Sequence, residues 1–155
     1  MSARLHQFSR SLAQDARGAM VIETAIVAPV LLLLALGGFE SSRIVARQTE
    51  LQTAAAEAAA IVRASPPTTA AHRTTVRDVV KTSLGLQDAN VTVTEKYRCG
   101  DAEAIVTDKT TCGADDAVAT YIEVVITDSY VPVWTSFGVG STVDYRVDRM
   151  VFISS

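Results

Sequence analysis

The chain has 155 residues, 48% of them hydrophobic and 20% charged, and its formal net charge is −3 at pH 7. This length suffices for one small domain beside a membrane segment and leaves no room for a second, enzyme-sized unit. Residues 1–18 carry three arginines and one aspartate, a net +2, so their removal would lower the charge from −3 to −5. Binding to phosphates requires clustered Lys and Arg, so we do not expect a nucleic-acid partner.

A basic leader precedes a long apolar run. Residues 1–17 hold three arginines against one acid, whereas residues 19–39 are apolar except for Glu23 and Thr24. A bilayer core about 30 Å thick requires about 20 helical residues, so this run of 21 residues predicts one membrane span. No segment after Glu40 approaches this length without charged residues, so residues 40–155 are expected outside the membrane. The short basic leader is expected in the cytoplasm.

The border between leader and span indicates an export signal that is cut before its apolar segment. Ordinary secretory signals end in small residues after that segment, but here Gly18 and Ala19 stand before it. Glycine lets a protease approach an extended backbone closely. Glu23 could then neutralise the new ammonium group of Ala19 in a neighbouring subunit, because unpaired charges at membrane depth are costly. The alternative is a glutamate that merely complements the helix dipole.

The helical pattern continues beyond the membrane. Its apolar positions recur at steps of three, four and seven residues, and Pro66 ends it. Residues 19–64 therefore predict one rod of 46 residues, about 69 Å long. Pro29 removes the hydrogen bond to the carbonyl of Ala25 and is expected to bend the rod. The predicted inner positions are Ile44, Leu51, Ala55, Ala58 and Val62.

The remaining residues predict a small α+β domain. A short helix over Thr69–Leu84 carries one apolar stripe and stops at Gly85. Segments rich in Val, Thr, Tyr and Ile predict strands of a small antiparallel sheet over residues 90–98, 117–127 and 142–153. The predicted stripe comprises Val76, Val79, Val80 and Leu84. The predicted domains are a leader (1–18), a transmembrane helix (19–40), an amphipathic extension (41–64) and an external domain (65–155).

The chain has two cysteines, Cys99 and Cys112. An even number in an exported domain predicts a disulfide. Closing a loop of this length would contribute about 3 kcal/mol on the entropic model. Two free thiols or a weak metal site are the alternatives.

Residues 17–37 read Arg-Gly-Ala-Met-Val-Ile-Glu-Thr-Ala-Ile-Val-Ala-Pro-Val-Leu-Leu-Leu-Leu-Ala-Leu-Gly. This segment resembles the N-terminal signature of TadE-like proteins, which are minor pilins or pseudopilins of the tight-adherence (Tad) type IV pilus system. The likeness covers residues 17 to about 64 and is loose beyond them. Major pilins of this subclass are much shorter and tend to have Glu-Tyr where this chain has Glu23-Thr24. The resemblance therefore favours a minor or accessory role.

The resemblance implies that a prepilin peptidase cuts after Gly18, that Ala19 becomes the N-terminus and that Glu23 is needed for processing or subunit pairing. It also implies residence in the bacterial inner membrane as a single-pass protein, with the C-terminal domain periplasmic or extracellular. The implied partners are other pilin subunits and the Tad inner-membrane assembly machinery, in pilus assembly for adhesion and surface colonisation. It leaves open whether the product enters the fibre, caps it or only primes assembly.

No catalytic, cofactor or metal site is predicted. His6 lies in the leader and His72 in a polar connector, so no Ser/His/Asp or Cys/His set can be assembled. Acidic residues lie between the cysteines and at Asp115 and Asp116. Calcium accepts such oxygens, but their spacing does not match an EF-hand, and a solvated acidic loop is the simpler interpretation.

A different class of function is an uncleaved, signal-anchored protein whose external domain captures a ligand or partner. The apolar connection over residues 131–140 contains Trp134 and Phe137, which would be its natural contacts. Their other role would be to cover the inner face of the rod. A conventional signal peptidase cut after Gly37 would instead release a soluble protein that begins at Gly38.

Overall fold

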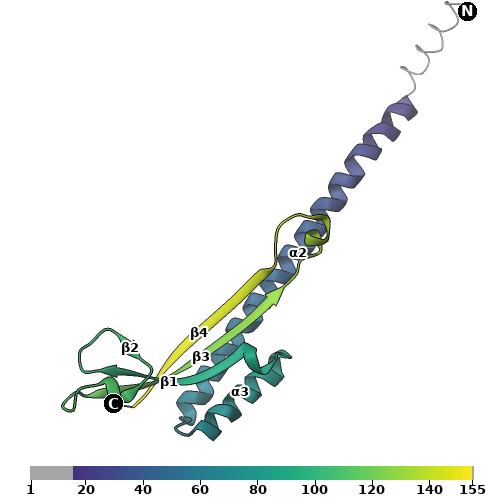
Figure 1. Ribbon diagram of the computed structural model, residues 1–155. Helices are drawn as coiled ribbons and strands as arrows, with labels where there is room; N and C mark the ends of the chain where they lie inside the picture. Colours follow the sequence, from purple (N-terminus) through teal and green to yellow (C-terminus); the bar gives the residue numbers. More distant parts are fainter. Residues whose placement is uncertain (1–15, 155) are drawn as a thin grey trace, which may run out of the picture. The chain divides into compact units, whose positions relative to one another are not determined.

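The computed structural model describes the backbone of residues 16–154 and the side chains of residues 20–154. Most of the predicted leader, residues 1–15, lies outside the described residues. The chain divides into two compact units, Met1–Ser42 and Arg43–Ser155. Helix α2 (Ala16–Ala64) contributes to both units (Figure 1). The domain boundaries predicted after residues 18, 40 and 64 stay predictions.

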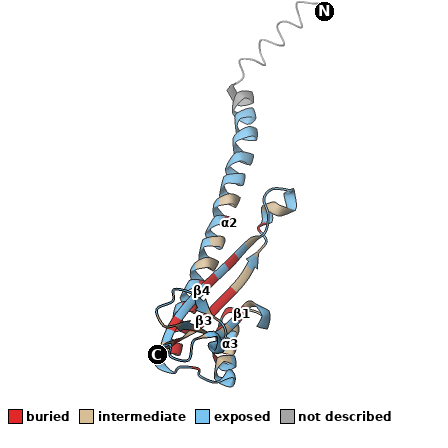
Figure 2. Cartoon of the chain, turned by 60° about the vertical axis from the view of Figure 1, so that its left-hand side comes forward, coloured by how far each residue is buried: buried red, intermediate tan, exposed pale blue. Residues whose placement is uncertain are grey.

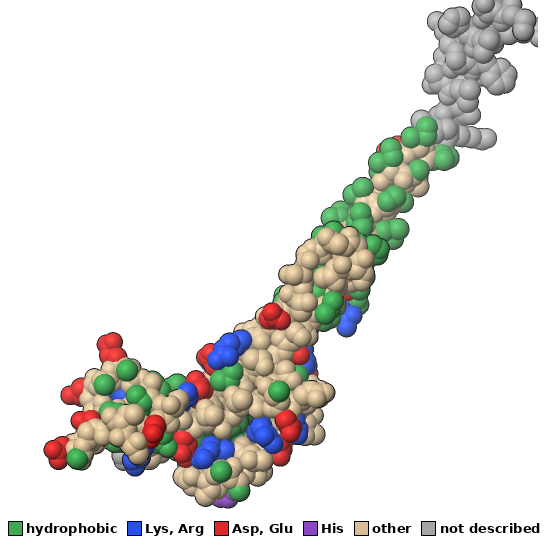
Figure 3. Space-filling view, viewed as in Figure 1, with side chains coloured by type: hydrophobic (Ala, Val, Ile, Leu, Met, Phe, Trp, Pro, Cys, Tyr) green, Lys and Arg blue, Asp and Glu red, His purple; other side chains and the backbone are tan. Residues whose placement is uncertain are grey.

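The described part of the first unit is the N-terminal portion of α2. Its large apolar side chains between Met20 and Leu34 are 46–70% exposed, and they cover this stretch in Figure 3. Among the described residues, α2 is the one helix long and apolar enough to cross a membrane. The helix continues without interruption through Pro29. Proline thus does not end the helix, and the bend at Pro29 stays a prediction.

The second unit contains a four-stranded antiparallel sheet, which confirms the α+β class. Its strand order is β2-β1-β3-β4, so the long strand β3 is central and pairs with β1 and β4 along most of their lengths. The register shifts between Thr120 and Tyr121, because β4 has one extra residue, Ile153, opposite this step of β3. The strands are β1 (Val91–Cys99), β2 (Ile105–Val106), β3 (Val118–Tyr130) and β4 (Val143–Ser154).

Two helical surfaces and one face of the sheet form the core of the second unit (Figure 2). Side chains alternate between the faces of a strand, so Ile122, Val124 and Ile126 of β3 share one face. These three residues are fully buried in one cluster with the inner positions of α2 and α3. The small side chains of Ala55 and Ala58, both 0% exposed, allow close packing at this face. The predicted inner face of the rod is confirmed, with Ile44 partly buried at its border.

Helix α3 (Ala70–Leu84) begins one residue after its predicted start at Thr69 and is capped at both ends. The Thr69 hydroxyl accepts a hydrogen bond from the His72 amide, which satisfies one of the unpaired N–H groups at the helix start. At the other end Gly85 adopts a left-handed conformation with φ 65°, which favours glycine. Of the predicted stripe, Val76, Val80 and Leu84 are buried. Val79 is 51% exposed, so its assignment to the stripe is wrong.

The structure also corrects the strand predictions. Strand β3 extends to Tyr130, three residues beyond its predicted end, because β4 pairs with it along this stretch. Asn90 lies in the short 3-10 helix η1 (Asp88–Asn90) instead of in the first strand. Strand β2 was not predicted, since two residues show no alternation and its pairing with Tyr97 and Arg98 is a tertiary contact.

Candidate functional site

The predicted cleavage junction lies within α2. The helix is described from Ala16, three residues before its predicted start at Ala19, so the bond between Gly18 and Ala19 has a helical backbone. A protease that needs an extended backbone would therefore have to unwind the helix locally at this bond.

Glu23 follows the junction on an exposed part of α2. The next residue, Thr24, donates a hydrogen bond from its hydroxyl to the carbonyl of Met20 at 2.8 Å, so its polar group is satisfied within the helix. A hydroxyl bound in this way is compatible with an apolar environment. Glu23 is the one ionisable side chain between Met20 and Phe39, so it is the charge that membrane insertion must accommodate.

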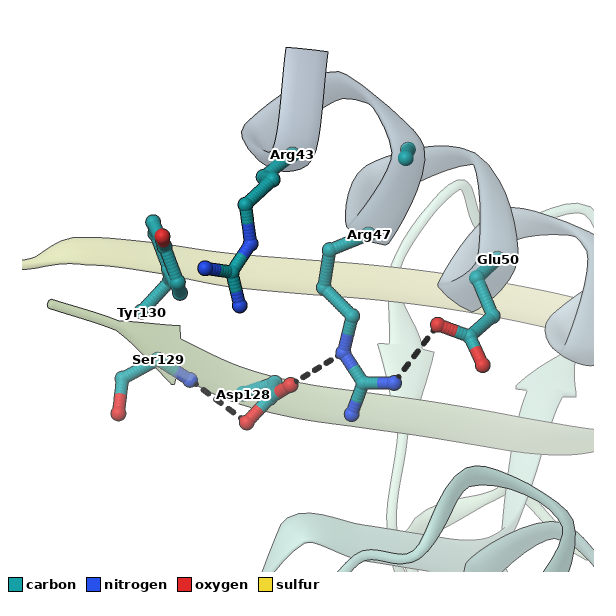
Figure 4. A pocket seen from close by; sticks show the side chains of 7 residues that line it. Arg43, Arg47, Glu50, Asp128, Ser129 and Tyr130 are labelled. Atoms are coloured by element: carbon teal, nitrogen blue, oxygen red, sulfur yellow. Dashed lines mark hydrogen bonds and ion pairs between the residues drawn. The ribbon is translucent and has the colours of Figure 1, made fainter. Parts of the chain in front are cut away.

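In the second unit, Arg47 joins α2 to the end of β3 (Figure 4). Its Nε lies 2.6 Å from Asp128 Oδ2, and its Nη1 lies 2.8 Å from Glu50 Oε2. Nη2 also donates a hydrogen bond of 3.4 Å to the carbonyl of Leu84, at the end of α3. One guanidinium group therefore connects both helices with the sheet.

Neighbouring contacts extend this connection. The Arg43 guanidinium carbon lies 5.2 Å from the centre of the Tyr130 ring, within the range of a cation–π interaction. On β4, the Tyr145 hydroxyl donates a hydrogen bond of 3.4 Å to the carbonyl of Ile44. A pocket of about 380 Å³ lies beside these contacts and is lined by Arg43, Ala46, Arg47, Glu50, Asp128, Ser129 and Tyr130.

The partners of Arg47 also determine its charge state. Desolvation lowers the pKa of Arg47, but the hydrogen bonds to Glu50 and Asp128 outweigh this effect, and the pKa is raised. The pKa of Tyr145 is raised as well, first by burial and then by the negative charge of Asp128. Arg47 thus remains a cation and Tyr145 a neutral hydrogen-bond donor at physiological pH. The pocket thus contains a structural network of ion pairs between Arg47 and the carboxylates of Glu50 and Asp128.

The connection between β3 and β4 contains both predicted contact residues. Trp134 and Phe137 lie in the 3-10 helix η3 (Val133–Phe137). Phe137 is 74% exposed, so it does not cover the inner face of the rod, whereas Trp134 is partly buried. Both residues remain candidates for contact with a partner.

The cysteines lie at the far end of the sheet. Cys99, the last residue of β1, is bonded to Cys112, and their Cα atoms are 5.2 Å apart. The bridge closes the loop that contains β2. Within this loop, the carboxylate of Asp108 accepts hydrogen bonds from the amide and the hydroxyl of Thr110. These hydrogen bonds lower the pKa of Asp108. In the described part of the chain, no three His, Cys, Asp or Glu residues are placed to hold a metal ion.

A comparison with known protein families identifies the N-terminal part of the chain. Residues 18–60 match the TadE-like protein family. This match confirms the resemblance, and it begins at Gly18, the residue before the proposed cut. The comparisons with curated proteins and with solved structures gave no match.

The TadE-like segment indicates a protein related to the Tad pilus. Together with the single candidate span found among the described residues, this segment suggests a single-pass membrane protein. The family is known as a structural component and not as an enzyme. The segment includes α2 from Gly18 onward and ends within its buried alanine face, so the sheet lies outside the match.

Sequence reasoning missed the contacts of Arg47. Arg47 and Asp128 are 81 positions apart, and each alone is an ordinary surface charge in its element. Their pairing depends on how the end of β3 lies against α2 within the second unit. No local spacing encodes that contact, although Asp128 follows the apolar residues 124–126 of β3 closely, and an acid beside buried positions is a signal of a specific partner.

Proposed function

We propose that this chain is a minor pilin or pseudopilin of a Tad-type pilus, cut by a prepilin peptidase between Gly18 and Ala19. The observation that carries the proposal is the family match, which starts at Gly18 and covers the apolar stretch of α2. The cut would leave α2 attached to the external domain. The helix then serves first as a membrane anchor and later as the element through which subunits assemble, in adhesion and surface colonisation.

The physical basis of assembly is the apolar surface of α2. Side chains such as Leu32 and Leu33 are 70% and 69% exposed, so they need either lipid or neighbouring helices around them. Burying such a side chain contributes about 1.5–3 kcal/mol when it is removed from water. A subunit that leaves the membrane must therefore exchange lipid for other helices. Other pilin subunits and the Tad inner-membrane machinery are the proposed partners.

The proposed orientation has the leader in the cytoplasm and residues 43–155 in the periplasm or outside the cell. The Cys99–Cys112 bridge supports this orientation, since disulfides persist in oxidising compartments. The peptidase would then act on the cytoplasmic side of the inner membrane. A second function, an uncleaved anchored module that captures a partner, is favoured by the exposed side chain of Phe137.

The mass of the protein from its native membrane decides between these functions. We expect a chain that begins at Ala19, as measured by intact mass or N-terminal sequencing. A chain that begins at Met1 would identify an uncleaved anchor and contradict the proposal. A chain that begins at Gly38 would instead indicate an ordinary signal peptide and a released product.

Replacement of Glu23 by glutamine is expected to reduce assembly more than membrane insertion. Glutamine has almost the same shape, but it cannot form an ion pair with the ammonium group of Ala19 in a neighbouring subunit. Loss of one partner of a buried pair costs about 3–5 kcal/mol, which weakens association about a hundredfold or more. Surface pili and cross-linked subunits measure assembly, and membrane fractionation measures insertion.

Glu57→Gln is the matched control, because Glu57 is an exposed glutamate in the aqueous part of the same helix. It should assemble as the unaltered protein does. Normal piliation of Glu23→Gln would remove the support for charge pairing.

A further inference from the structure

The loop over residues 131–142 presents apolar side chains to the exterior of the second unit. Val131, Phe137 and Val139 are 63%, 74% and 60% exposed, respectively. The twelve residues of this loop include no charged side chain. Scattered exposed apolar residues are normal on protein surfaces, but several within one uncharged loop indicate a contact surface.

The loop has an ordered backbone. The amides of Thr135, Gly138 and Val139 donate hydrogen bonds to carbonyls within the loop, at 3.0–3.2 Å. The Thr135 hydroxyl likewise donates to the carbonyl of Pro132. Because these polar groups are satisfied internally, the loop can enter a poorly hydrated environment at a lower cost than an open loop.

Two glycines shape this surface. Gly138 and Gly140 have φ of 74° and 72°, in the left-handed region. A Cβ atom at Gly140 would lie 3.1 Å from Nε1 of Trp134, so the absence of a side chain lets the indole lie against the backbone. Trp134 is thereby held beside the exposed apolar residues.

The contacts of Tyr130 show which end of the sheet carries the loop. Tyr130 is the last residue of β3, and its ring lies under the guanidinium of Arg43. Arg43 follows Phe39, the end of the apolar run, by four residues. Four residues reach at most about 14 Å even when fully extended. The loop therefore starts beside a residue that the chain itself keeps near the membrane surface.

We propose that the loop over residues 131–142 is a second membrane contact, which inserts Phe137, Val131 and Val139 into the interfacial layer of the bilayer on the side of the external domain. The partner that this loop contacts is the lipid surface. Tryptophan and other aromatic side chains are enriched at this depth, and apolar groups enter it by about 5–10 Å. The contact would fix how the external domain lies on the membrane before assembly. It requires neither cleavage after Gly18 nor a pilus, so it goes beyond the proposed function.

Trp134 makes the proposal testable because it is the only tryptophan in the chain. The full-length protein is reconstituted in phosphatidylethanolamine and phosphatidylglycerol vesicles, with or without bromine atoms on the acyl chains near the headgroup. We expect loss of Trp134 emission in the brominated vesicles and protection of the remaining emission from aqueous iodide. Equal emission in both kinds of vesicle, together with quenching by iodide, would overturn the proposal.

Phe137→Asp should lift the loop from the lipid, which decreases bromolipid quenching and increases iodide quenching. Phe152→Asp is the matched control, because Phe152 is 53% exposed on β4 and pairs in register with Tyr121, far along the sheet from Tyr130. It should behave as the unaltered protein. Bromolipid quenching that persists in Phe137→Asp would overturn the proposal. Protection from iodide that disappears at a lower protein-to-lipid ratio would also overturn it, by identifying another protein copy as the occupant.

Discussion

Replacement of Gly18 by leucine is expected to leave the chain uncut, with no detectable product that begins at Ala19. The peptidase must bind an extended backbone at close range, and a leucine side chain would occupy the space that glycine leaves free. Leucine is also a better helix former than glycine, which costs roughly 0.8–1 kcal/mol relative to alanine, so it would oppose local unwinding of α2 at the junction. Intact mass of the membrane-extracted protein, from cells with an active peptidase, measures the result.

Gly37→Leu is the control for this prediction. Gly37 lies in the same helix, and a Cβ atom there would meet nothing within 4 Å. This variant should insert into the membrane and be cut normally. If Gly18→Leu is also cut normally, the assignment of the junction is wrong, whatever the family of the segment.

Replacement of Ala58 by leucine is expected to lower the free energy of unfolding of the external unit by about 1–3 kcal/mol, the usual cost of overpacking. Ala58 is 0% exposed and lies in the cluster that joins α2 to the sheet. A larger side chain there must displace either the helix or the strands. Urea unfolding followed by circular dichroism, with the protein in detergent micelles, measures the change.

Ala56→Leu provides the comparison, because Ala56 is exposed on the same helix two residues earlier. Its effect should stay within about 0.5 kcal/mol, as for most surface substitutions. Both variants change helix propensity equally, so the difference between them isolates packing. Equal losses in the two variants would show that the alanine face does not pack as the structure has it.

The candidate sites differ in how far local sequence could predict them. The leader junction depends on neighbouring residues, namely Gly18, Ala19 and Glu23 beside an apolar run, so local sequence suffices to predict its position, and cleavage there stays a prediction. The Cys99–Cys112 disulfide could be predicted from the sequence, because only one intramolecular pairing exists for two cysteines. The contacts of Arg47 could not be predicted from the sequence, since the packing of β3 against α2 is what brings Asp128 to Arg47.

The sequence by itself determined the elements that follow from local periodicity. A long apolar run makes the candidate membrane helix, alternation makes the long strands, and Thr69 and Gly85 delimit α3, because each pattern reflects hydrogen bonds and burial within a few residues. Only the tertiary structure decided that β2 pairs with β1 and that the end of β3 lies beside Arg43. Strand β2 is too short to show a periodicity of its own, and Arg43 and Tyr130 are far apart in the chain, so these contacts depend on strand register and helix packing.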